Sequence, residues 1–242
     1  MPNPYLLLWF EAPLQSWGSD SKFGRRDTQA FPTKSGVLGL VCSALGAGGE
    51  QRELLSEFAA LNQTVISFAR CRHIGEEAVK QEREPLLRDF HMVGSGYEKQ
   101  GAWANMMIPK TADGKPAAGG SKLTYRYYLQ DSAFAVAVEI PIERADTITS
   151  ALQNPAWSIY LGRKNCTPTD FVYRGKFDSE AHALELAESI AMQKERREDF
   201  RVVQGLLSEG EADEVFTLND VPVQFGEDKR YRDRQVSLIH AR

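Results

Sequence analysis

The stretch Phe31-Pro32-Thr33-Lys34-Ser35-Gly36-Val37-Leu38-Gly39-Leu40-Val41-Cys42 changes from polar residues to an apolar run, which predicts a helix that continues to about Leu45. We expect Ser35 to be the N-cap, because its hydroxyl can accept a hydrogen bond from the first turn. The free N–H groups of that turn, beside Lys34, would then attract a phosphate. The alternative is an ordinary capped core helix with solvated cations, and the local pattern does not decide between the two.

Two further cations, Arg25 and Arg26, precede this stretch and favour the phosphate interpretation. The sequence is nevertheless not a Walker A loop. That motif needs a glycine directly before the Lys-Ser pair and another glycine five residues earlier, whereas Thr33 and Thr28 stand at those positions. If the stretch does bind phosphate, a phosphodiester backbone could dock there.

Working outward, the apolar pattern predicts an α+β chain. The nearly continuous apolar run Tyr5–Phe10 indicates a central strand that is covered on both faces. The other predicted elements are a helix at about 50–62, a strand at 64–73, strands at 123–129 and 134–140, helices at about 142–153 and 179–195, and short strands near Phe200, Val215, Val221 and Val236. This order of elements fits a ferredoxin-like unit.

Between Gly75 and Lys122 the sequence is charged and contains glycine, with a loop tip at Asp113–Ser121. We interpret this part as an inserted hairpin. The expected organisation is a ferredoxin-like domain over residues 1–155, interrupted by the hairpin at about 75–122, and a small, mainly β region over residues 156–242 with a glycine-containing loop and one helix.

The composition predicts a folded chain with neither disulfides nor a metal site. The 242 residues are 42% hydrophobic, enough for a substantial core. The apolar segment near the start is too short to span a bilayer and has no basic region before it, so we expect a cytoplasmic protein. Cys42, Cys71 and Cys166 show no Cys-x-x-Cys spacing, which indicates buried free thiols. We expect no cofactor.

The formal net charge of −4 argues mildly against a nucleic-acid ligand, but the distribution of charge changes that conclusion. The segment Asp178–Glu214 holds eleven acidic residues and four basic ones, whereas Tyr160–Lys176 holds four basic residues and only one acidic residue, Asp170. A protein with one cationic face and one acidic face can bind a polyanion on the first and other protein subunits on the second.

Several motifs occur in a characteristic order along the chain. They are Pro13-Leu14-Gln15-Ser16-Trp17-Gly18, Phe31–Leu40, Arg88-Asp89-Phe90-His91, Tyr125-Arg126-Tyr127-Tyr128-Leu129 and Tyr160-Leu161-Gly162-Arg163-Lys164. Each is weak alone, but together they resemble the Cas-five family of CRISPR-associated proteins in its type I-E Cascade form. The resemblance covers most of the chain, although the part after about Glu180 carries little that matches.

The resemblance implies a structural RNA-binding subunit of an antiviral surveillance complex, which caps the repeat-derived 5′ handle of the CRISPR RNA. It implies a modified ferredoxin-like (RRM-like, RAMP) domain with a thumb, for which the inserted hairpin is the natural candidate. The implied partners are the CRISPR RNA, the backbone CasC subunit and the large CasA subunit. Target DNA would be reached only indirectly, because base pairing with the guide supplies the sequence specificity.

Some candidate RNA contacts have a structural alternative. Trp17 could stack on a base and Gln15 could bond to a base edge, but an aromatic residue there is equally suited to the core. Arg88 and His91 lie on the expected thumb, where Asp89 permits a purely local ion pair. The complete set of candidate RNA-binding residues is Gln15, Trp17, Arg25, Arg26, Lys34, Ser35, Arg88, His91, Arg126, Arg163 and Lys164.

The main alternative function is a metal-independent endoribonuclease that processes CRISPR precursor RNA, as one subfamily of these proteins does. Such cleavage needs a base for the 2′-hydroxyl group. His91, Lys99 and Tyr97 have suitable chemistry, and His73 or His240 could contribute if the fold brought them close. The sequence shows no His–Asp nuclease pair and no carboxylate cluster with metal-ligand spacing. We therefore expect a non-catalytic subunit, with a pure assembly protein as the third alternative.

Overall fold

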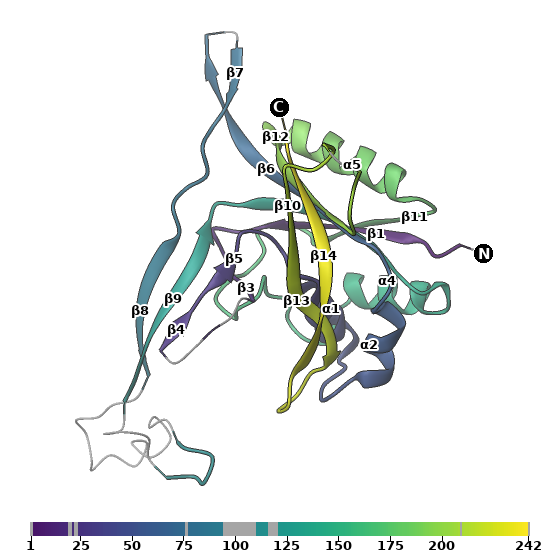
Figure 1. Cartoon of the computed structure of the whole chain (residues 1–242). Coiled ribbons are helices and arrows are strands. Elements are labelled where there is room, and N and C mark those ends of the chain that lie inside the picture. The colour runs from purple at the N-terminus through teal and green to yellow at the C-terminus, as the bar shows by residue number, and fades with distance from the viewer. Residues whose placement is uncertain are drawn as a thin grey trace.

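The computed structural model describes residues 2–18, 21, 24–75, 77–93, 110–115, 121–208 and 210–241. Within these residues the largest sheet has eight strands, in the order β11-β1-β10-β6-β12-β14-β13, with β7 paired to β6 (Figure 1). Its strands are β1 (Tyr5–Glu11), β6 (Gln63–Ile74), β7 (Glu77–Lys80), β10 (Ala133–Glu139), β11 (Tyr173–Phe177), β12 (Arg196–Gln204), β13 (Glu214–Gln224) and β14 (Arg230–His240).

The helices and the smaller sheets surround this sheet. The helices are α1 (Lys34–Leu45), α2 (Arg52–Phe58), α4 (Ala145–Gln153), which follows the 3-10 turn η2 (Ile142–Arg144), and α5 (Glu180–Gln193). A second sheet contains β2 (Leu14–Gln15), β4 (Arg25–Arg26), β8 (Leu87–Val93) and β9 (Lys122–Gln130), and β3 (Trp17–Gly18) pairs with β5 (Thr28–Gln29). None of the helices in the described ranges has the length and apolarity that a membrane span requires.

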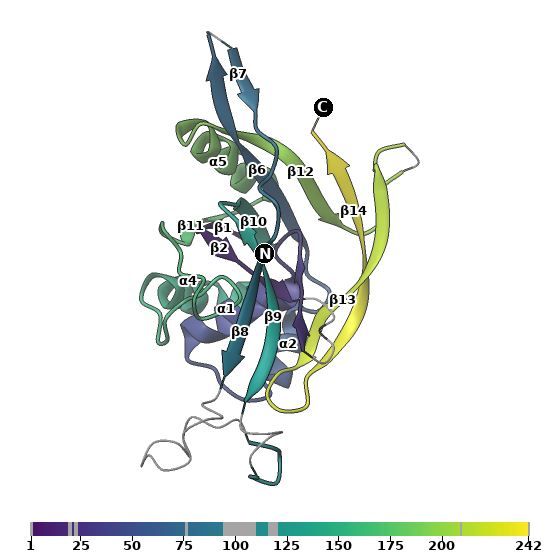
Figure 2. The same cartoon turned by 90° about the vertical axis from the view of Figure 1, so that its left-hand side faces the viewer.

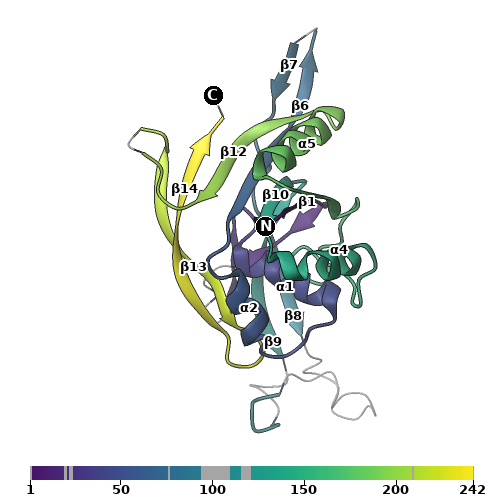
Figure 3. The same cartoon turned by 90° about the vertical axis from the view of Figure 1, so that its right-hand side faces the viewer.

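The first strand is central and buried on both faces, as its sequence predicts. Leu8 and Phe10 join the core formed with α1, α2 and α4, whereas Leu7 and Trp9 join the core beneath α5. Successive side chains of a strand point to opposite faces, so one continuous apolar run supplies both cores. The main sheet is therefore the middle layer between α5 on one face and the other helices on the opposite face (Figures 1 and 3).

The packing of α5 depends on small residues. Alternate positions of β10 are alanines, and α5 buries its own alanines against the same face of the sheet. Because the facing side chains of α5 and β10 are only methyl groups, the helix can pack closely on the sheet. These residues are Ala133, Ala135, Ala137, Ala183, Ala187 and Ala191.

Helix α1 lies where the sequence predicts it, but its N-cap is Thr33 and not Ser35. The Thr33 Oγ1 atom accepts a hydrogen bond from the Gly36 N–H at 3.2 Å. Ser35 lies in the first turn, and its hydroxyl oxygen is 3.3 Å from Thr33 Oγ1. The helix ends at Gly46, whose φ of +67° is a left-handed conformation that glycine adopts without steric cost.

The late strands are longer than expected. The short strands predicted near Phe200, Val215, Val221 and Val236 are the long strands β12, β13 and β14, and β11 was not predicted. Moreover, β11 pairs with β1 and β12 pairs with β6, so the main sheet is continuous across residue 155. The C-terminal hairpin of β13 and β14 curves along one side of the molecule (Figure 2).

The insertion between β6 and β10 forms two hairpins instead of the single one expected over 75–122. Strand β7 folds back on the end of β6, and β8 pairs with β9. The two hairpins project from opposite ends of the body (Figures 1 and 2). Residues 113–115 of the predicted loop tip are described, and residues 116–120 lie outside the described residues.

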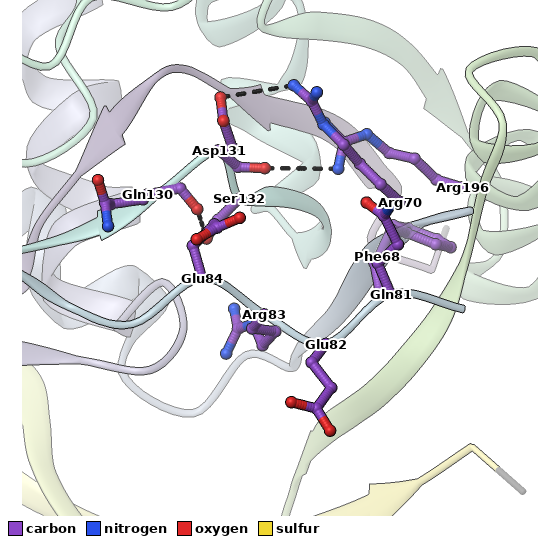
Figure 4. A pocket seen from close by; sticks show the side chains of 11 residues that line it. Phe68, Arg70, Gln81, Glu82, Arg83, Glu84, Gln130, Asp131, Ser132 and Arg196 are labelled. Carbon is purple, nitrogen blue, oxygen red and sulfur yellow. Dashed lines mark hydrogen bonds and ion pairs between the residues drawn. The ribbon is translucent and has the colours of Figure 1, made fainter. Parts of the chain in front are cut away.

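The segment between β7 and β8, which connects the two hairpins, lines a small cavity of about 90 Å³ (Figure 4). The Arg83 guanidinium carbon lies 5.3 Å from the ring centroid of Phe134 and 5.1 Å from that of Phe200. On the other side, Arg70 forms an ion pair with Asp131 at 3.4 Å. The Arg83 contacts tie the connecting segment to β10 and β12, and the Arg70–Asp131 pair joins β6 to the turn between β9 and β10.

Candidate nucleic-acid interface

Strands β4, β8 and β9 present one exposed face that combines arginine and aromatic residues. Arg25 on β4 and Phe90 on β8 both lie opposite Tyr125 of β9, and Arg88 lies opposite Tyr127. Directly opposed residues of paired strands share a face of the sheet. We call this surface, formed by Arg25, Arg88, Phe90, Tyr125 and Tyr127, the arginine–aromatic face.

The side chains of this face stack on one another. The guanidinium carbon of Arg25 lies 4.7 Å from the ring centroid of Tyr127, and that of Arg88 lies 5.6 Å from the centroid of Tyr125. The rings of Phe90 and Tyr125 are 5.4 Å apart and are 56% and 47% exposed. Exposed ring faces can stack on unpaired bases, and guanidinium groups can bind phosphates.

The opposite face of the same strands carries the other predicted cations. Arg126 lies opposite both Arg26 and Asp89, and its Nε donates to the Thr124 hydroxyl at 3.2 Å. His91 Nδ1 lies 3.6 Å from Asp89 Oδ2, which is the local pair that the sequence allowed. Both faces of this projecting sheet therefore carry positive charge.

The glycine-containing loop after Tyr160 holds this sheet against the body. Arg163 donates to the carbonyl oxygens of Tyr127 at 3.1 Å and Arg26 at 2.9 Å. A Cβ atom at Gly162, where φ is +95°, would lie 1.6 Å from the Ser16 carbonyl oxygen. The close approach that requires glycine is thus made to the protein's own backbone. Lys164 is exposed.

Gln15 and Trp17 belong to the core and are not available to a base. Both side chains are fully buried, and the Trp17 ring packs on Phe10 with 5.1 Å between centroids. Gln15 Nε2 donates to the carbonyl oxygens of Phe10 and Ser132, and its Oε1 accepts from Trp17 Nε1 at 3.1 Å. The alternative that the aromatic residue packs in the core is the correct one.

Lys34 is also buried, which contradicts its expected exposure to a phosphate. Its Nζ donates to the carbonyl oxygens of Ala59 and Leu61 and to Gln204 Oε1. Burial, helped by the nearby Arg234 cation, lowers the pKa of Lys34 to about 8. The lysine joins the start of α1 to the end of α2 and to β12.

An internal carboxylate occupies the entrance of α1 where a phosphate was expected. Asp220 Oδ2 accepts the Lys34 N–H at 2.7 Å, and Arg234 binds the same carboxylate through Nε at 2.7 Å and Nη2 at 2.9 Å. Asp220 is 186 residues away from Lys34 in sequence, so no local pattern could indicate this contact. The helix start thus holds an anion, but one supplied by β13.

The residues considered for catalysis are dispersed. His73, His91 and His240 lie on β6, β8 and β14, respectively, and Tyr97 and Lys99 lie outside the described residues. Within the described part of the chain, no group of three or more His, Cys, Asp or Glu residues could hold a metal ion. Cys42 and Cys166 are buried free thiols, and Cys71 is half-buried.

Phe90, Tyr125 and Tyr127 are absent from the residues predicted individually. The signal was present, because aromatic residues alternate with polar ones in Leu123-Thr124-Tyr125-Arg126-Tyr127, as on a strand with one aromatic face. Pairing with β4 and β8, which brings Arg25 and Arg88 onto that face, could not be deduced from the pattern alone.

The chain resembles several known proteins over most of its length. The profile of the family described as CRISPR-associated protein (Cas_Cas5) matches residues 5–237. The CRISPR system Cascade subunit CasD of Escherichia coli (strain K12) is 32% identical over 178 residues, which are 71% of this chain and 70% of that protein.

Two solved structures share the fold. A chain of a structure entitled CRISPR RNA-guided surveillance complex aligns with a TM-score of 0.67 and 28% identity, over 98% of this chain and 89% of that one. A second, entitled Crystal structure of Cas protein, aligns with a TM-score of 0.59 and 27% identity, over 98% of this chain and 94% of that one.

Proposed function

Because the chain belongs to the Cas5 family of CRISPR-associated proteins, we propose that it is a structural subunit of a type I-E Cascade surveillance complex that binds and caps the 5′ handle of the CRISPR RNA. In this role the protein holds the backbone and shape of the guide, and base pairing between guide and target supplies sequence specificity. Its partners are the guide, the backbone CasC subunit and the large CasA subunit.

The arginine–aromatic face is the observation that carries the proposal. Unpaired RNA is bound by stacking on aromatic and guanidinium planes and by phosphate contacts, and Arg25, Arg88, Phe90 and Tyr125 offer both on one exposed surface. The other predicted contacts that are not fully buried are Arg26, Ser35, His91, Arg126, Arg163 and Lys164. Gln15, Trp17 and Lys34 are buried and stabilise the body, whereas Arg163 supports the face through its hydrogen bonds to the Tyr127 and Arg26 carbonyl oxygens.

The fold that supports this role is a ferredoxin-like domain. The chain order β1, α1, β6, β10, α4, β11 is strand-helix-strand-strand-helix-strand, and these strands lie in the order β11-β1-β10-β6 with antiparallel pairing throughout. Both features are those of a split β-α-β arrangement. The β8–β9 hairpin, which projects from this unit and carries the arginine–aromatic face, is the thumb.

The test is binding of the purified chain to handle RNA and protection of the handle from nuclease within the assembled complex. We expect binding that weakens steeply as salt concentration rises, because phosphate contacts release counterions. Absence of any handle protection in a complex that contains the chain would overturn the proposal.

Deletion of residues 113–120 should leave the body folded while reducing co-purification with the backbone subunit, since loop tips contribute few buried contacts.

We propose a non-catalytic role, because the described residues offer two His–carboxylate pairs, His91 with Asp89 and His73 with Glu195, and the two histidines lie on separate hairpins at opposite ends of the body. The competing function, metal-independent cleavage of CRISPR precursor RNA, has a direct test. The isolated protein is incubated with labelled repeat RNA in the presence of a chelator. Discrete cleavage products would establish the nuclease, and intact RNA is the expected result.

A further inference from the structure

We propose that a groove between α5 and the β6–β7 hairpin docks a basic segment of another protein subunit that inserts an aliphatic side chain. The groove has a volume of about 500 Å³. Its lining residues come from β6, β7, α5 and the start of β12. This proposal rests on the proposed function, because it looks for the partner among the other subunits of the Cascade complex.

The walls of the groove are fixed relative to each other. The Cys71 N–H on β6 donates to the Glu195 carbonyl oxygen at 2.8 Å, just beyond the C-terminal end of α5. His73 Nε2 lies 3.8 Å from Glu195 Oε1. The hairpin therefore stands beside the end of α5, as Figure 3 shows, and the groove is already formed in the chain alone.

The groove offers apolar surface to a partner. Phe68 and Ala191 form buried parts of its lining, and Met192, also in the lining, is 79% exposed. On the same hairpin, Ile74 is 62% exposed. Methionine is flexible and polarisable, so it adapts to an inserted aliphatic group, and exposed apolar surface beside a groove is typical of protein interaction sites.

The charges around the groove select a basic protein segment and not RNA. Glu188 and Glu195 in the lining have side chains that are 61% and 72% exposed. Arg196 is 3% exposed and paired with Glu11 at 2.8 Å, so its charge is compensated internally. Glu198, also in the lining, is paired with Arg201 at 2.6 Å, and the same arginine lies 4.0 Å from Glu188. Arg197 is exposed, so the exposed charges of the lining are the two carboxylates and one guanidinium group. Such a surface repels phosphates and attracts lysine or arginine.

The position of the groove allows both ligands to bind together. In Figure 1 the β6–β7 hairpin and α5 lie at the top of the molecule, whereas β8 and β9, which carry the arginine–aromatic face, lie at the lower left. A protein subunit on the groove would leave the guide surface open. The chain would thus join the 5′ end of the guide to a subunit that does not need to contact the same strands.

The test places a photo-crosslinking residue, p-benzoylphenylalanine, at Met192 in the full chain co-expressed with the other subunits and the guide. Its side chain is exposed, so the substitution should not disturb folding. We expect crosslinks to a lysine- or arginine-rich segment of another subunit. The matched control is the same residue at Ile142, which is apolar and 37% exposed but lies on η2 and not in the groove.

Two outcomes would overturn the docking proposal: crosslinks from Met192 to RNA, or none to protein in a complex that is assembled and retains the guide. Failure of the wild-type chain to join the complex or to protect the handle would instead refute the proposed function.

As a second measurement, the M192E/E188K variant should reduce the subunit's retention in the complex about tenfold, with handle-RNA affinity unchanged. The control E143K, at an exposed glutamate outside the groove, should have no effect.

Discussion

Cations in this protein occupy two contrasting environments: some lie within the body, and others cover the projecting β4–β9–β8 sheet. The first group is buried and donates to the protein's own carbonyl and carboxylate groups, whereas the second is exposed to solvent and lies over aromatic rings. Lys34 and Arg234 belong to the first group, and Arg25 and Arg88 belong to the second. The comparison teaches that a basic residue in a promising motif indicates a ligand only when its side chain remains exposed: Lys34 is buried, whereas Arg25 stays accessible although it is paired with Asp27 at 2.8 Å.

Lys34 shows why the distinction is physical. Removing an ammonium group from water is costly unless hydrogen-bond acceptors replace the solvent. Three acceptors surround Lys34 Nζ: the carbonyl oxygens of Ala59 and Leu61 and the Oε1 atom of Gln204. Arg25 has lost little hydration, because its side chain is 62% exposed and its bond to Asp27 is a surface ion pair.

The comparison would be tested most strongly by reversing the buried charge. Lys34→Glu should lower the free energy of unfolding by about 3–5 kcal/mol, because it places a carboxylate among carbonyl oxygens and near Asp220. Arg25→Glu is the matched surface variant and should change it by less than about 0.5 kcal/mol. Denaturant unfolding followed by circular dichroism measures both. Equal stability of the two variants would remove the distinction.

The same lysine predicts a pH dependence. Its pKa is lowered from the usual 10.5 to about 8 in the folded protein, mainly by burial. Between these two values the unfolded chain binds more protons than the folded one, so this residue makes the free energy of unfolding rise with pH. Lys34→Met should reduce that rise between pH 8 and 10.5. An identical slope in the variant would contradict the lowered pKa.

The exposed cations should instead affect RNA binding without affecting stability. Removing both guanidinium groups in R25A/R88A should weaken handle-RNA binding by about 3 kcal/mol in total. It should also reduce the slope of log affinity against log salt by about two units, since each lost phosphate contact contributes roughly one. The control is Arg52→Ala, another arginine with a side chain 62% exposed, on α2. An unchanged salt slope in R25A/R88A would exclude phosphate contacts on this face.

The aromatic rings of the same face should contribute to RNA binding by stacking and not by charge, which separates their effect from that of the arginines. Tyr125→Ala should cost about 1–3 kcal/mol of RNA affinity through lost base stacking, with the salt slope close to that of the wild type. Tyr125→Phe keeps the ring and should retain nearly full affinity. Binding titrations at several salt concentrations distinguish the two effects. Loss of affinity in both variants would point to the phenol hydroxyl and argue against stacking.

Local patterns were sufficient for the elements that their own residues stabilise. The run at Tyr5–Phe10 became the buried central strand, and the helices after Lys34 and Ser179 begin where polar residues give way to apolar ones. The late strands were underestimated, because β12 pairs with β6 and β14, and β14 pairs with β12 and β13. Such pairing is a tertiary interaction that a single segment does not show.

The site was less predictable than the fold for the same reason. Lys34, Ser35 and Gly36 resemble a phosphate site, but the carboxylate that occupies the helix entrance comes from β13. Conversely, the arginine–aromatic face exists only because β4 and β8 pair with β9 on either side of Tyr125. The sequence motifs predicted Arg25 and Arg88 as RNA contacts, whereas the register of the paired strands showed that Tyr125 lies between β4 and β8 on the same face.

The smallest expected effect concerns His91, which lies on the face opposite the exposed rings and pairs with Asp89 at 3.6 Å. If its role is positional, His91→Ala should remove at most one hydrogen bond to RNA, about 1 kcal/mol, and guide RNA length should stay unchanged. Asp89→Asn is the matched variant, because it keeps the shape of the pair and removes the carboxylate charge. Guide length is measured by gel analysis of RNA extracted from cells in which the dedicated processing nuclease is present and active. Accumulation of unprocessed precursor with His91→Ala would mean that this imidazole acts as a general base, and the exposed cations would then serve a catalytic site rather than a structural cap.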